Sequence, residues 1–290
     1  MTDPIPSFAF SPPGTGVELE VMDLAELRSR TPEGHPQRVH RLDFHTITLV
    51  TQGTGERMVD FATFPCRPGT LLWVRPGQVQ RFAPGSGLNG PHLLFTSTFP
   101  LDFTGSDRLV THWLGPTCWQ LGTSREYASV ASLLAQLSAE SHRGPVVPSA
   151  AAAVVTQQIQ QFLLAAIMLQ ISRLSPYDER EHDSEVYARF RAELELSYPS
   201  TRRAEDYAAR LGYSVKTLSR ACLAAVGQPV KRVINGRVAL EAQRLLAHTD
   251  EPVAIISRRL GFSEPTNFGK FFVRHTGTTP GEFRMRLISA

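Results

Sequence analysis

Two short stretches near the C-terminus of the chain repeat one another. Residues 211–214 (LGYS) recur 49 residues later as residues 260–263 (LGFS). With one inserted residue, Leu218, Arg220 and Gly227 align with Phe268, Lys270 and Gly277. A repeat that preserves apolar, charged and turn positions predicts that one structural unit occurs twice.

Each copy has the sequence pattern of a helix, a tight turn and a second helix. In the first copy a helix over 204–211 ends at Gly212, and Ser214 can cap a helix that stops at Gly227. In the second copy a helix over 253–260 ends at Gly261, and a helix beginning near Pro265 stops at Gly277. Two helices joined by a turn of about three to four residues with glycine indicate helix-turn-helix units at 204–227 and 253–277.

The segment between the copies, residues 229–248, is predicted to be one helix. Twenty residues at 1.5 Å each span about 30 Å, which is close to the ~34 Å between successive major-groove faces on one side of B-DNA. Residues 201–290 also hold 15 Lys and Arg against 7 Asp and Glu, whereas residues 1–200 hold 15 against 20. A basic C-terminal third points to a polyanion partner, such as double-stranded DNA, although many solvated faces are basic too. The alternative, helical hairpins of an enzyme core, does not explain the matched cations Arg220 and Lys270.

The first part of the chain has the pattern of short β-strands separated by turns. Residues 44–51 (FHTITLVT) are rich in β-branched and aromatic side chains, and a return strand over 56–64 follows the turn at 53–55. Further strands are expected within 67–77, 78–82 and 92–98. Such strands predict a sandwich or small barrel.

Helical periodicity follows the strands. One amphipathic helix is expected over 127–141 and a longer one over 150–174, which is apolar on more than one face and therefore needs cover from its own domain or from a second subunit. No apolar run reaches the ~18 residues of a membrane span, so we expect a cytoplasmic protein. The three cysteines are far apart and are expected to be buried free thiols.

The C-terminal region resembles the AraC/XylS family of bacterial transcription regulators. The resemblance rests on residues 253–262 (VAIISRRLGF), 267–272 (NFGKFF), 279–284 (TPGEFR) and 204–246, and it covers about residues 186–290. It departs from the family at Ser257, where alanine is usual, and at Pro265. Residues 53–55, 66–72 and 76–77 resemble, more weakly, the cupin-like ligand-binding and dimerisation domain of the family.

This resemblance implies an α+β multidomain protein: an N-terminal cupin-like β-barrel with dimerisation helices, and a C-terminal all-α double helix-turn-helix joined by a connecting helix. The expected boundaries are an effector-binding domain over 1–140, a helical dimerisation segment over 141–175, a linker over 176–185 and a DNA-binding domain over 186–290. It further implies an effector-responsive activator that forms a homodimer and contacts RNA polymerase.

Carried over by position, six side chains face the DNA, on the side of each second helix opposite its apolar residues. Any one of them could instead meet a phosphate or solvent. The predicted contacts are Lys216, Ser219 and Arg220 in the first unit and Thr266, Asn267 and Lys270 in the second.

The same resemblance places a small-molecule effector of unknown identity inside the barrel, with Arg38, His45, Phe82 and His92 as candidate lining residues. No metal, cofactor or enzymatic activity is expected, because the histidines form no His-x-His pair and no catalytic motif is apparent. Two alternatives stay open: a cupin-type enzyme with an appended DNA-binding tail, and a ligand-independent DNA binder.

Overall fold

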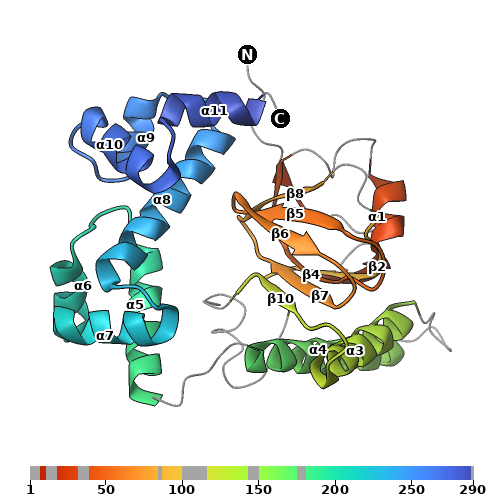
Figure 1. The fold of residues 1–290 in the computed structure, drawn as a ribbon. Helices are drawn as coiled ribbons and strands as arrows, with labels where there is room; N and C mark the ends of the chain where they lie inside the picture. The colour runs from red at the N-terminus through yellow and green to blue at the C-terminus, as the bar shows by residue number, and fades with distance from the viewer. Residues whose placement is uncertain are drawn as a thin grey trace. The chain divides into compact units, whose positions relative to one another are not determined.

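The computed structural model describes residues 7–10, 18–31, 39–83, 87–99, 116–142, 150–174 and 181–288. The chain divides into two compact units, one of residues Ser7–Pro176 and one containing Tyr177–Ala290 (Figure 1). Each unit has its own hydrophobic core, and each is described separately below.

The first unit contains two five-stranded sheets. Sheet A has the order β1 (Ser7–Phe8), β3 (His40–Leu42), β8 (Val79–Phe82), β5 (Gly55–Val59) and β6 (Ala62–Cys66). Sheet B has the order β10 (Cys118–Gln120), β7 (Thr70–Val74), β4 (His45–Leu49), β9 (Pro91–Phe95) and β2 (Leu19–Asp23). Apart from the parallel pair β1–β3, all strand pairs are antiparallel. The predicted β-rich N-terminal domain is confirmed.

Sheet B is buried on both faces, so β4 and β7 contain no exposed residue. Alternate residues point to opposite sides of a strand. Ile47, Leu71 and Trp73 lie in the core shared with helices α3 (Arg125–Ser141) and α4 (Ala150–Arg173), which cover that face in Figure 1. Leu72 lies in the core between the sheets, together with Leu24 of α1 (Leu24–Arg30).

Helix α4 is only partly covered by its own unit. Leu164, Ile167, Met168 and Ile171 are completely buried against sheet B and α3. On other sides of the helix Val154, Val155, Phe162 and Leu169 are exposed, and Phe162 is 72% exposed. Residues Ala151–Arg173 are, by length and composition alone, apolar enough to cross a membrane, with a mean hydropathy of 1.4. This finding is an average over a window that includes polar glutamines, and core helices of proteins outside membranes meet the same criterion; the buried side of α4 packs as part of a protein core.

The second unit is a set of helices. They are α5 (Glu181–Ser197), α6 (Ala204–Leu211), α7 (Val215–Val226), α8 (Val230–His248), α9 (Val253–Arg259), α10 (Pro265–Thr276) and α11 (Pro280–Ile288). The linker predicted over 176–185 is helical from Glu181, and residues 176–180 lie outside the described residues. The helix extends to this point because Val186, Tyr187, Phe190 and Leu194, all buried, give α5 one continuous apolar stripe.

Both predicted helix-turn-helix units are present, joined by the predicted connecting helix α8. Gly212 and Gly261 end the first helix of each unit with φ of 71° and 73°, a left-handed backbone that favours glycine. Ser214 caps α7 by accepting a hydrogen bond from the backbone N–H of Thr217 at 3.0 Å. Gly227 and Gly277 end the second helices in the same left-handed conformation. The two units are thus built from the same turns, as the repeat predicts.

Arg237 holds α8 against α5. Its Nε donates to both carboxylate oxygens of Glu195, at 3.0 and 2.8 Å, and its Nη1 donates to Glu241 at 3.0 Å. The guanidinium also lies over the Tyr198 ring, 4.0 Å from its centroid. Burial lowers the pKa of Arg237, but the charge and hydrogen bonds of Glu195 and the charge of Glu241 together outweigh it, so the pKa is raised. Arg237 therefore stays charged and clamps the connecting helix.

The turn of the second unit packs against the loop between α5 and α6. The guanidinium of Arg202 lies 3.4 Å from the centroid of the Phe262 ring, and its Nη2 donates to the Gly261 carbonyl at 3.3 Å. A Cβ at Gly261 would lie 2.9 Å from the Pro199 carbonyl oxygen, whereas a Cβ at Gly212 would meet nothing within 4 Å.

This difference predicts unequal costs for two otherwise matched substitutions. Gly212→Ala and Gly261→Ala both place a side chain in the left-handed region, which costs about 1–2 kcal/mol. Gly261→Ala must in addition displace Pro199, so we expect it to lower the free energy of unfolding by about 1 kcal/mol more. Urea denaturation of the two variants measures this difference, and equal losses would show that the packing of Pro199 on Gly261 is wrong.

Candidate DNA-binding surface and effector cavity

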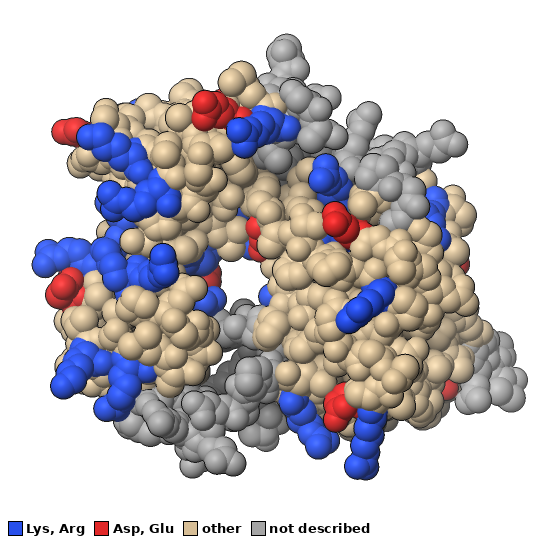
Figure 2. Space-filling model, in the orientation of Figure 1, with Lys and Arg blue, Asp and Glu red and all other residues tan. Residues whose placement is uncertain are grey.

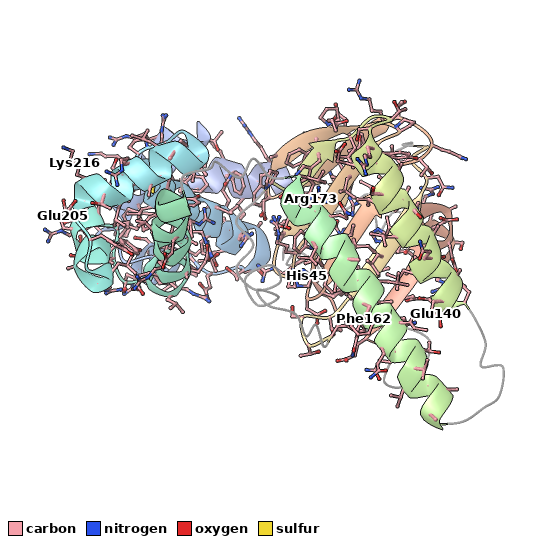
Figure 3. The ribbon with its side chains drawn as sticks, turned by 90° about the horizontal axis from the view of Figure 1, so that it is seen from below. His45, Glu140, Phe162, Arg173, Glu205 and Lys216 are labelled. Carbon is pink, nitrogen blue, oxygen red and sulfur yellow. The ribbon has the colours of Figure 1, made fainter. Side chains whose placement is uncertain are left out.

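Helix α7 has one buried and one exposed side. Leu218, Ala221 and Cys222 are buried in the second unit. Lys216 and Arg220, one helical turn apart, are both exposed, and Ser219 beside them is half-buried. Figure 3 shows Lys216 at the outer edge of this unit. The three side chains predicted to contact DNA in the first unit therefore share one accessible side of α7.

Helix α10 has the same arrangement. Phe268 and Phe272 are fully buried, and the Phe268 ring meets Phe262 edge-on at a centroid distance of 5.2 Å. Thr266, Asn267 and Lys270 are exposed on the other side. Pro265 occupies the first turn of the helix, where the missing N–H leaves no hydrogen bond unmade. The structure thus brings together the three predicted residues of the second unit.

Further cations surround these two helices, and Figure 2 shows lysines and arginines gathered over the second unit. Arg210 is paired with Glu193 at 3.0 Å and Arg259 with Glu251 at 3.2 Å. Such exposed pairs are weak, so these arginines can exchange a carboxylate for a phosphate. Apart from Arg232, which the sequence suggested as a phosphate contact, their only signal was the net charge of the region. The exposed cations include Arg203, Arg210, Arg232, Arg258, Arg259 and Arg274.

The first unit contains a cavity of about 840 Å³. Its walls are mostly apolar, with Phe10, Met22, Phe44 and Leu94 among them. Its polar lining is formed by Glu20, Arg30, Thr31, His40, Thr46, Gln80 and His92. A concave, mainly apolar site with a few convergent polar groups is the usual form of a small-molecule pocket.

The four predicted effector residues have different positions. Phe82 and His92 both line the cavity. His45 does not: its ring stacks on Phe95 at a centroid distance of 4.7 Å and accepts a hydrogen bond from Trp73 Nε1 at Nδ1, 3.3 Å away. It lies on the same side of β4 as Ile47, toward α3 and α4. Arg38 lies outside the described residues.

Sequence reasoning missed a buried arginine behind the cavity wall. Arg57 is 1% exposed, and its guanidinium lies over the Phe82 ring at 4.1 Å. Its Nη1 donates to Thr48 Oγ1 at 2.7 Å and its Nη2 to Gln80 Oε1 at 2.6 Å. The alternation of strand 56–64 could have shown that Arg57 points inward with Val59, but a buried cation is an unusual expectation.

Two histidines of this unit, His45 and His92, are held neutral. Burial, with the charge of Arg75 added, lowers the pKa of His45 to about 3. Burial, with the charge of Arg57 added, lowers the pKa of His92 well below its ordinary value. Over the described part of the chain, no group of three or more His, Cys, Asp or Glu side chains could hold a metal ion. Cys66 and Cys222 are buried free thiols as predicted, whereas Cys118 is half-buried.

Comparison with known proteins identifies relatives of both units. Residues 26–190 match a family model described as AraC-like ligand binding domain, and residues 207–286 match one described as helix-turn-helix domain. The chain is similar to the HTH-type transcriptional activator RhaS of Shigella dysenteriae serotype 1, with 25% identity over 97% of this chain and 96% of that protein. RhaS of Escherichia coli O139:H28 is 24% identical over 84% of this chain and 86% of its own length.

Solved structures with similar folds include ToxT of Vibrio cholerae O395. It covers 86% of this chain and 92% of its own, at 10% identity and a TM-score of 0.45. The C-terminal domain of AraT, a response regulator from Geobacillus stearothermophilus, covers 36% of this chain and 86% of its own, at 23% identity and a TM-score of 0.34.

The neutral state of His45 predicts a pH dependence of stability. The pKa of this histidine in the folded chain is below its value in the unfolded chain, so the unfolded state binds more protons between about pH 6.5 and pH 3. Above about pH 6.5 the stabilisation that depends on a neutral His45 is fully present. Below this pH, the titration of His45 lowers the free energy of unfolding by at most ~1.4 kcal/mol per pH unit. His45→Asn keeps an acceptor for Trp73 but cannot titrate.

Urea titrations of both proteins between pH 7 and pH 5 measure this effect, above the range in which most carboxylates titrate. We expect a shallower loss of unfolding free energy in the variant. Identical slopes would mean that His45 is not buried as a neutral ring.

Proposed function

We propose that this chain, which belongs to the AraC/XylS family of transcription regulators, is an effector-responsive activator that recognises two adjacent segments of the major groove. The observation that carries the proposal is the continuous helix α8, which joins two helix-turn-helix units with matched exposed cations. Its 19 residues span about 28 Å, close to the ~34 Å repeat of the groove.

In this proposal α7 and α10 are the recognition helices. Arg220 and Lys270 donate to guanine O6 and N7, and Asn267 pairs with adenine. Lys216, Ser219 and Thr266 make the remaining contacts along the same sides of the helices. Arg232, exposed near the start of α8, contacts a phosphate. Lys231 is less available, because its Nζ donates to the Arg202 carbonyl at 2.6 Å.

The first unit senses the effector and joins two copies of the chain. The cavity lined by Phe82 and His92 is the proposed effector site, with no metal or enzymatic step. The exposed apolar residues of α4 are covered by α4 of a second copy, because a helix with apolar side chains on several sides needs such cover. The protein activates transcription, the role printed in the names of its RhaS relatives. In this proposal it acts in the cytoplasm and contacts RNA polymerase.

Two variants distinguish side chains that contact bases from side chains that contact phosphates. The operator is first obtained by selecting bound DNA from random sequence with the full-length protein. Arg220→Ala should weaken operator binding by about 1–3 kcal/mol while hardly changing binding to scrambled DNA. Arg232→Ala should weaken both and reduce the salt dependence by about one unit. Salt titrations of affinity measure both effects. Equal loss on both DNAs for Arg220→Ala would mean that α7 does not read bases.

Negatively charged side chains introduced on the exposed side of α4 test whether this helix forms the dimer. Val155 and Phe162 are 54% and 72% exposed, and Phe162 lies on the side of α4 that faces the viewer in Figure 3. Replacing both with Glu should produce folded monomers by light scattering. Leu196→Glu, at a leucine of α5 that is 78% exposed, is the matched control and should leave the dimer intact. A wild-type protein that is monomeric at micromolar concentration would contradict the dimer.

A further inference from the structure

Arg57 is a buried cation without an acidic partner. Among the described residues no carboxylate pairs with it, and its hydrogen bonds go only to the neutral side chains of Thr48 and Gln80. Its Nε, also buried, has no hydrogen-bond partner. Burial lowers the pKa of this guanidinium to about 10. Since buried charges are normally paired, the first unit carries an uncompensated positive charge beside the cavity.

The hydrogen bonds of Arg57 fix the tautomer of His92. Thr48 Oγ1 accepts from Arg57 at 2.7 Å, and its other hydrogen-bond partner among the described residues is His92 Nδ1 at 2.8 Å. Donation to Nδ1 is the arrangement that leaves the hydroxyl proton paired. Nδ1 is therefore an acceptor, and in a neutral ring Nε2 then carries the proton. His92 lines the cavity, and its Nε2 makes no hydrogen bond to any described residue. The charge of Arg57 thus produces a hydrogen-bond donor directed at the cavity.

A second donor in the cavity wall also lacks a partner. Thr46 lines the cavity, its side chain is fully buried, and its Oγ1 has no hydrogen-bond partner among the described residues. Thr46 and Thr48 are alternate residues of β4 and point to the same side of sheet B. Thr48 pairs in register with His92 of β9. The hydroxyl of Thr46 and the imidazole N–H of His92 therefore belong to one wall, and the cost of a buried, unpaired hydroxyl is relieved by a ligand that accepts from it.

We propose that the effector is a small organic anion, a carboxylate on an apolar body, whose oxygens accept hydrogen bonds from His92 Nε2 and Thr46 Oγ1 in front of Arg57. This inference rests on the proposed function, since it names the chemical class of the effector for that site. The apolar body lies against the aromatic and aliphatic walls, among them Phe10, Phe44 and Leu94.

The charges around the cavity agree with an anion. Among the cavity-lining side chains that the structure describes, Glu20 is the one acidic residue, and its carboxylate is paired with Arg30. Arg57 is then the charge that no protein group balances. A carboxylate gains from this charge in a low-dielectric site, whereas a neutral amide of the same shape gains much less.

The test uses the full-length protein and matched pairs of probes that differ only in charge. They are 3-phenylpropanoate and its amide, 1-naphthoate and its amide, and cyclohexanecarboxylate and its amide, measured by titration calorimetry at pH 7.5. We expect at least one acid to bind about tenfold or more tightly than its amide. If no acid binds more tightly than its amide, whether or not the amides bind, the proposal is overturned.

Variants of the two donors distinguish this site from binding elsewhere. His92→Gln keeps an N–H near the position of Nε2, whereas the shorter side chain in His92→Asn keeps an acceptor near Nδ1 but has no donor that reaches the position of Nε2. His92→Asn should therefore lose the preference for the acid and His92→Gln should retain it. Thr46→Val should weaken acid binding about fivefold or more while raising the melting temperature of the unliganded protein, because it removes an unpaired hydroxyl. Ser97→Ala, which removes a hydroxyl that pairs with His45 at 3.2 Å, is the control and should change neither. Acid binding unaffected by both His92→Asn and Thr46→Val would place the anion elsewhere and overturn the assignment.

Affinity for the selected operator without probe separates this inference from the proposed function. If the protein binds its operator but binds no acid more tightly than the matching amide, the proposed function stands and only the inference about the class of effector is wrong. Failure to bind DNA specifically would remove the proposed function, whatever the cavity binds.

Discussion

The clamp between Arg237 and Glu195 fixes the direction of α8, and both helix-turn-helix units are built on that helix. Val238, Ala242, Leu245 and Leu246 of α8 form part of the core that holds α9 and α10. At the other end Val230, Val233 and Ile234 are buried in the same unit of the protein. Arg237 is 11% exposed but Glu195 is 36% exposed, so solvent screens the pair and removing one partner costs less than the ~3–5 kcal/mol typical of a fully buried pair. Loss of this clamp would therefore change the separation of the recognition helices before it changed either helix itself.

The loop between α5 and α6 adds a second constraint. Arg202 joins it to the turn of the second unit through Phe262 and the Gly261 carbonyl, while Tyr207 of α6 donates to the Thr201 carbonyl at 3.0 Å. The two units are thus connected by the helix and again by this loop. A domain connected in two places resists bending about α8, and a rigid separation is what simultaneous reading of two groove segments requires.

In the first unit the decisive constraint is that sheet B is covered on both faces. One face carries the apolar contacts to α3 and α4, and the other carries Thr46, Thr48 and His92 toward sheet A. Because the faces alternate along each strand, an arginine, a threonine and a histidine can form a hydrogen-bonded chain only one residue away from a dry core. The same strand that supplies a core residue, Ile47, also supplies the floor of the cavity.

The sequence predicted the helical half well because its signals are local. A glycine marks the turn of each unit, a serine caps α7 of the first unit, and a proline lies in the first turn of α10 of the second. The prediction for His45 was less successful for a physical reason: in a sheet buried on both sides, apolar patterning does not reveal which face is the cavity. That choice depends on the register of Thr48 opposite His92, a pairing of residues 44 positions apart. Arg57 was missed because charged residues are seldom buried, and its acidic neighbour Glu56 points to the opposite, exposed side of the strand.

The proposed DNA binding requires that the two recognition helices α7 and α10 are held at a fixed separation. The distance between the two halves of the operator tests this requirement most directly. Five base pairs, about half a helical turn, are inserted between the two halves of the selected operator, and affinity of the full-length protein is compared with the original site and with a ten-base-pair insertion. We predict that both insertions reduce affinity to that of a single half, because α8 can neither rotate nor stretch. Unchanged affinity for either spaced site would contradict the rigid connection.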